Sequence, residues 1–146
     1  MVATFCIYAQ VQDHEFTNYD DDEYVTESSL VQSGLTTESV IQVFTTMHFG
    51  GWQPMTSLSY LLDYELYGLN PTGYLLANLF FHIAGSLFLF LALLRMTGAI
   101  WQSAFVAAMF ALHPLNVESV AWISERKNVL STLFWIMTMW AYIHYA

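Results

Sequence analysis

After residue 65, three long stretches of the chain contain no charged residue. Residues 66–94, 96–117 and 128–146 include no Asp, Glu, Lys or Arg. A helix needs about 20 mostly apolar residues to cross the hydrocarbon core of a membrane. The pattern therefore predicts an all-α integral membrane protein that crosses the membrane several times, with transmembrane helices over 73–94, 99–114 and 128–146.

The connections between these helices are short. Residues 95–98 leave room only for a tight turn, which we place on the cytoplasmic side. Residues 115–127 are predicted to form a short external helix, because Glu118, Trp122 and Arg126 follow one another at four-residue spacing and so share one stripe.

The first part of the chain has a different pattern. Residues 1–10 are apolar but are about half the length that a span needs, so we interpret them as a truncated first span. Residues 11–72 are polar and acidic, and are predicted to form an external loop.

Two short amphipathic helices are expected within this loop. The first follows Thr36 or Thr37 as its cap and is expected to lie on the membrane surface. Its apolar positions at helical spacing are Val40, Ile41, Phe44 and Met47. The second follows Pro54 and stops at Gly68. Its expected apolar face consists of Leu58, Leu61, Leu62 and Leu66.

The distribution of charge narrows the choice of partners. The net charge is −9. Ten of the twelve acidic residues precede residue 66, and this part of the chain contains no Lys or Arg. A chain this acidic is not suited to nucleic acid. Cys6 is the only cysteine, which excludes an internal disulfide.

The few basic residues bear on orientation. If the acidic loop is external, Arg95 is cytoplasmic whereas Arg126 and Lys127 are external, which runs two to one against the positive-inside rule. We interpret this exception as a sign that Arg126 and Lys127 are retained outside to hold a phosphate at the membrane surface.

Three segments carry a resemblance to a known family: FTNYDDDEYV at 16–25, WQPMTSLSYLLDYELYGLNPTGYLLANLFFH at 52–82, and HPLNVESVAWISERKNVLSTLFW at 113–135. They resemble the N-terminal membrane region of GT-C glycosyltransferases, namely the transmembrane and tetratricopeptide-repeat protein O-mannosyltransferases, with bacterial-type relatives the closer match. The resemblance implies part of a GT-C type multispanning helical bundle. It does not extend to the family's remaining spans or repeats, so we expect an N-terminal fragment that is inactive alone.

The resemblance also implies a reaction. Family members move a sugar, here expected to be a hexose such as mannose, from a polyprenyl-phosphate carrier to an acceptor hydroxyl, typically of protein Ser or Thr. An acidic pair in the first external loop is catalytic, and it corresponds here to Asp20 and Asp21, with Asp22 as a third candidate. A carboxylate suits this role because a general base must take the hydroxyl proton, and a single displacement inverts the anomeric centre.

The remaining candidates follow from the leaving group, a lipid phosphate. Arg126 and Lys127 are expected to bind this donor phosphate. Glu118 either holds Arg126 or approaches the acceptor, and His113 either contacts the carrier or only ends a span. No cofactor is expected. The implied location is a bacterial inner membrane with the site facing the periplasm, or the endoplasmic reticulum membrane in a eukaryote.

Alternative interpretations remain open at this point. The DDDE run is also typical of a solvated loop or a divalent-cation site, although four consecutive acids cannot all face one ion. Glu118 and Arg126 are equally consistent with a structural ion pair. The chain as a whole is also consistent with a small non-catalytic membrane protein that binds a partner or lipid, or with a transporter fragment.

Overall fold

A computed structural model describes residues 2–8, 10, 15–17, 20–47 and 51–145, and over these residues the regular structure is helical. The predicted all-α class is therefore confirmed for the described residues. The elements are α1 (Val2–Tyr8), the π-helical turn η2 (Asp22–Thr26), α2 (Ser29–Gln32), α3 (Thr37–Thr45), α4 (Pro54–Tyr67), α5 (Pro71–Thr97), α6 (Ile100–Leu112), α7 (Asn116–Ala121) and α8 (Arg126–Tyr145).

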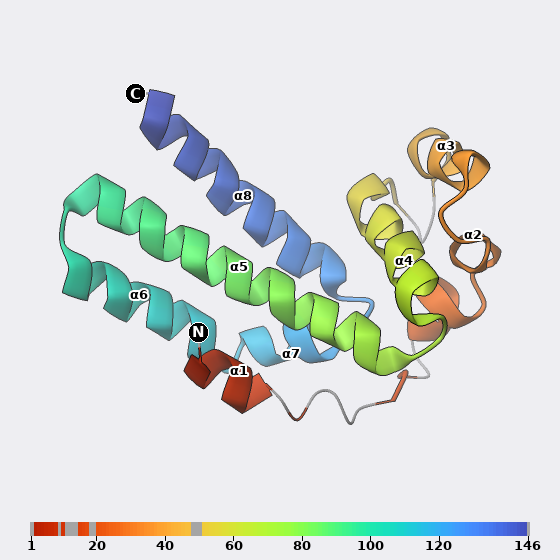
Figure 1. Ribbon diagram of the computed structural model, residues 1–146, viewed down its shortest axis with the longest axis horizontal. Helices are drawn as coiled ribbons and strands as arrows, with labels where there is room; N and C mark the ends of the chain where they lie inside the picture. Colours follow the sequence, from red (N-terminus) through yellow and green to blue (C-terminus); the bar gives the residue numbers. More distant parts are fainter. Residues whose placement is uncertain (1, 9, 11–14, 18–19, 48–50, 146) are drawn as a thin grey trace.

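Helix α5 is the axis of the molecule, with α6 folded back antiparallel along one side and α8 running in the same direction as α5 along another (Figure 1). Asn70 caps its first turn by accepting a hydrogen bond from the Thr72 amide, and Pro71 is its first residue. Gly98 ends it in the left-handed conformation, with φ of 67°. The reversal is therefore at Gly98, and residues 95–97 of the predicted turn at 95–98 are the last residues of α5.

The length of each helix bears on the predicted spans. Among the described helices, only α5 is long and apolar enough to cross a membrane by length and composition, and it contains the predicted span 73–94. Helix α6 has 13 residues, which is shorter than the predicted 99–114 and than a typical span. Helix α8 covers most of 128–146. One membrane-spanning helix is thus supported, and the multispanning bundle stays a prediction.

The two amphipathic helices form where the sequence predicts them. Thr36 caps α3 through a capping box with Ser39, and Gly68 follows the last residue of α4. The face predicted for α4 is divided: Leu58 and Leu61 pack inward, whereas Leu62 and Leu66 are exposed. The buried side of α4 also carries Tyr60 and Asp63.

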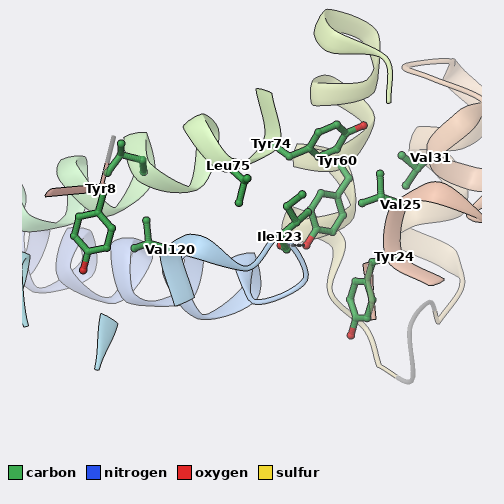
Figure 2. Packing of buried hydrophobic residues seen from close by; sticks show 10 residues of the cluster. Tyr8, Tyr24, Val25, Val31, Tyr60, Tyr74, Leu75, Val120 and Ile123 are labelled. Carbon is green, nitrogen blue, oxygen red and sulfur yellow. Dashed lines mark hydrogen bonds between the residues drawn. The ribbon is translucent and has the colours of Figure 1, made fainter. Parts of the chain in front are cut away.

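An aromatic core joins the acidic segment to the helices (Figure 2). Tyr24 packs edge-on to Tyr60 with ring centroids 6.4 Å apart, and Tyr60 lies 6.3 Å from Tyr74. Val25 and Ile123 are buried in the same cluster. This core fixes the acidic segment at the end of the bundle where α5 begins.

The predicted continuous helix at 115–127 is wrong. Helix α7 ends at Ala121, and Trp122 follows in an extended conformation. Arg126 is the first residue of α8, so Glu118 and Arg126 do not share one helical stripe. The physical cause is that side chains of other elements bind the backbone of the connecting segment.

Candidate functional site

Arg126 lies at the centre of the site and is completely buried. Its Nη1 atom lies 2.5 Å from the Asp63 carboxylate and also donates to the Ser59 hydroxyl. Its Nε donates to Asn78 at 2.7 Å, and its Nη2 donates to the Tyr74 carbonyl at 2.7 Å. Each nitrogen of the guanidinium group therefore has a protein acceptor drawn from α4 or α5.

The surroundings of Arg126 suit a buried charge. The guanidinium carbon lies 4.7 Å from the centre of the Tyr60 ring, where the negative face of the ring attracts a cation. Burial raises the pKa of the Asp63 carboxyl, and the Arg126 guanidinium beside it opposes this shift. The pair joins the start of α8 to the middle of α4.

The segment between α7 and α8 is held by side chains from three other parts of the chain. Asn78 Nδ2 donates to the Trp122 carbonyl at 3.0 Å, and the Tyr60 hydroxyl donates to the Ile123 carbonyl at 2.7 Å. Burial raises the pKa of Tyr60, which keeps its hydroxyl protonated and able to donate. These bonds replace the helical bonds that the predicted helix at 115–127 would have made.

Asp21 makes the third attachment to this segment. Its Oδ1 accepts a hydrogen bond from the Ser124 amide at 2.9 Å, and its Oδ2 accepts one from the Thr17 amide at 3.0 Å. The side chain is almost fully buried. Both carboxylate oxygens are thus engaged by backbone donors, which makes Asp21 the link between the acidic run and the α7–α8 segment.

The two other candidate acids are more accessible. Asp20 and Asp22 are half-buried. Asp22 accepts a hydrogen bond from the Thr26 hydroxyl within η2. Asp20 lies close enough to Lys127 for its negative charge to help raise the pKa of that lysine. The structure therefore brings the acidic run and Lys127 together.

Lys127 follows Arg126 in sequence but has a different environment. Its side chain is 33% exposed, and its Nζ lies 3.1 Å from the Glu125 carboxylate and 5.5 Å from the Tyr24 ring centre. Burial lowers the pKa of Lys127, but the hydrogen bond to Glu125 and the nearby negative charges outweigh this, so the net shift is upward. Lys127 stays charged and accessible.

The two supporting candidates lie outside this cluster. Glu118 is exposed on α7, and the carboxylate paired with Arg126 is that of Asp63 instead. His113 is exposed after α6, where its Nδ1 accepts a hydrogen bond from the Leu115 amide. His113 directly follows the last residue of α6, and its expected roles stay predictions.

A groove of about 490 Å³ opens beside Lys127. It lies between the start of α4 and the first turns of α8, and most of its lining is apolar. Trp52 and Met55 line one side, and Leu130 and Phe134 line the other. An apolar groove with a cation at its edge suits an amphiphile with a negative head.

The sequence of the chain is similar to parts of several known proteins. Over 94 residues, or 63% of this chain, it is 35% identical to the protein O-mannosyl-transferase TMTC2 of Homo sapiens. Over 91 residues it is 31% identical to TMTC3 of Homo sapiens, also a protein O-mannosyl-transferase. The chain is similar in part to protein O-mannosyl-transferases. The similarity to F38B6.6 of Caenorhabditis elegans, another protein O-mannosyl-transferase, is 27% but covers 80% of this chain.

The similarity is distant and partial. The matched region spans 11% of human TMTC2 and 18% of the C. elegans protein, so the chain corresponds to a small part of each relative. The chain matches no protein-family model. No solved structure matches it either.

Three residues that build the site were not among the predicted site residues: Asp63, Asn78 and Tyr60. A signal existed for Asp63, because it is the first charged residue after the uncharged stretch 39–62 and lies in a helix with apolar neighbours. No local pattern indicates that Tyr60 and Asn78 bind the backbone of residues 122–123, since those contacts depend on the packing of α4, α5 and α8.

Proposed function

We propose that this chain is part of a membrane glycosyltransferase that moves a hexose such as mannose from a polyprenyl-phosphate carrier to a Ser or Thr hydroxyl. The observation that carries the proposal is the joining of two predicted parts of the site. Asp21 binds the Ser124 amide, which holds the acidic run beside Lys127. The partial similarity to protein O-mannosyl-transferases supports the same reaction class.

In this proposal the three candidate acids have different roles. Asp20 is the general base: it takes the proton of the acceptor hydroxyl as that oxygen attacks the anomeric carbon. Asp21 is a positioning residue, because both of its oxygens already accept backbone hydrogen bonds. Asp22 braces η2 through Thr26. The bond between the anomeric carbon and the phosphate oxygen breaks, and its electron pair stays on that oxygen. The configuration at the anomeric carbon inverts.

The two candidate cations also have different roles. Lys127 is accessible and stabilises the negative charge that develops on the departing polyprenyl phosphate. Arg126 is buried and holds the first turn of α8, which carries Lys127. Glu118 and His113 remain candidates for contacts with acceptor and carrier outside this cluster. The reaction as proposed needs no metal or cofactor.

The test is an Asp20→Asn change in the gene that encodes the chain, in its own cells. Transfer of labelled mannose to protein hydroxyls is expected to fall by about 10²–10⁴, the usual effect of losing a general base. Glu23→Gln is the matched control, because Glu23 is exposed in the same acidic run. Immunoblotting confirms equal protein levels. Wild-type transfer with Asp20→Asn would remove Asp20 from catalysis.

A further inference from the structure

Large apolar side chains are exposed where α3 ends and α4 begins. We call this set the α3–α4 apolar surface: Ile41, Phe44, Met47, Trp52 and Met55. Trp52 Nε1 donates a hydrogen bond to the Phe44 carbonyl at 3.2 Å, which joins the end of α3 to the segment before α4. The set is therefore one surface that two helices share, and not a scatter of single residues.

Helix α3 has three distinct sides. Val43 is buried against Leu61 of α4. Ile41 and Phe44 point away from that contact and are 57% and 48% exposed. Gln42 lies on the remaining polar side and is also exposed. A soluble protein rarely leaves a continuous apolar surface uncovered, so this one indicates a partner.

The position of this surface in the fold indicates which partner. Trp52 and Met55 share a groove with Leu130 and Phe134 of α8. Helix α8 lies alongside α5, the helix suited to cross a membrane (Figure 1). At 1.5 Å per residue, Phe134 lies about 12 Å along α8 from Arg126. The α3–α4 apolar surface therefore continues onto the side of the bundle that α5 would carry into lipid.

Charge supports the same partner. The ten acids of the first 65 residues leave a gap, since residues 39–62 contain no charged side chain. This gap contains the whole α3–α4 apolar surface. Tryptophan at the edge of such a surface is typical of the membrane–water interface. An acidic protein or a nucleic acid offers nothing complementary to an uncharged apolar surface, whereas the lipid interface does.

We infer that the α3–α4 apolar surface docks into the outer interface of the bilayer that α5 crosses. Docked side chains lie about 5–10 Å into the boundary between headgroups and acyl chains. The attachment is apolar, because the surface contains no Lys or Arg to attract anionic lipids. It holds the acidic run at a fixed height above the membrane, and it does not depend on the proposed glycosyl transfer.

The test uses spin labels on the whole chain, with Cys6→Ser, reconstituted in nanodiscs of phosphatidylcholine. Labels are placed by Phe44→Cys and, as the matched control, Gln42→Cys. Two residues along a helix are about 200° apart, so these exposed positions face nearly opposite directions. The label at 44 is expected to collide more with oxygen than with a water-soluble nickel chelate, and the label at 42 should show the reverse. Met47→Cys repeats the measurement at a second exposed position of the surface.

Each other outcome overturns the inference. Equal nickel access at positions 44 and 42 means that the surface faces water. Low collision with both reagents at position 44 means that protein covers it, either a second copy or another segment. Loss of the oxygen preference in high salt, or its appearance only after anionic phosphatidylglycerol is added, means that the attachment is electrostatic.

Discussion

The arginines found at the two ends of helix α5 differ in their burial and in their hydrogen-bond partners. At the turn end, Arg95 lies in the last turn of α5 and is exposed, and the neighbouring hydrogen bonds of Thr97 are local. At the other end, Arg126 is fully buried and binds side chains and backbone from α4 and α5. Long-range polar contacts are thus concentrated at the end with the candidate site. A turn needs only local chemistry, whereas a site needs distant segments fixed against one another.

The largest expected effect comes from removing the buried arginine. Arg126→Ala leaves Asp63 buried without its partner, which costs about 3–5 kcal/mol of unfolding free energy. Arg95→Ala at the exposed end should change it by no more than about 0.5 kcal/mol. Denaturant unfolding in detergent, followed by tryptophan fluorescence, measures both.

A double variant separates pairing from packing at Arg126. Arg126→Met combined with Asp63→Leu removes both charges, so part of the lost stability should return. If Arg126→Ala and Arg95→Ala are equally mild, the contrast between the two ends does not hold.

The next effect concerns Asp21. In Asp21→Asn one side-chain position becomes an NH₂ group facing a backbone donor, so one of the Thr17 and Ser124 amides loses its acceptor. A hydrogen bond to a charged group contributes about 1.5–3 kcal/mol, which is the expected loss. Hydrogen exchange at the Ser124 amide should accelerate. Asp20→Asn is the control, and its unfolding free energy should stay near that of the wild type.

Tyr60→Phe should have a smaller effect. It removes the hydroxyl that donates to the Ile123 carbonyl and keeps the ring beside Arg126. The expected loss is about 0.5–1.5 kcal/mol, the net contribution of a neutral hydrogen bond. Thr97→Val, which removes a local bond at the turn end, is the comparison. A larger loss for Thr97→Val would contradict the assignment of long-range order to the site end.

The smallest effect on stability should come from Lys127→Gln. Its pair with Glu125 is partly exposed, and such pairs contribute about 0–1 kcal/mol. The proposed phosphate contact nevertheless predicts slower mannose transfer with an unchanged melting temperature. Both measurements on one preparation decide the point, since loss of stability without loss of transfer would assign Lys127 to the fold alone.

Sequence patterns predicted the elements better than the site. Local signals sufficed for the cap at Thr36, the stop at Gly68 and a chain reversal at Gly98, because each depends on neighbouring residues. The helix predicted over 115–127 failed because side chains such as Asn78 and Tyr60 bind its backbone from elsewhere. Spacing alone paired Arg126 with Glu118, whereas packing pairs it with Asp63. The catalytic and phosphate-binding roles stay predictions.

The hydrogen bond between Asp21 and Ser124 also constrains the order of assembly. The two residues are 103 positions apart in the chain. During synthesis the acidic segment emerges first, and Asp21 cannot bind the Ser124 amide until residue 124 has left the ribosome. Closing a loop of this length is slow compared with forming a helix. The candidate site is therefore expected to be the last part of the molecule to become ordered, after α5 has already formed.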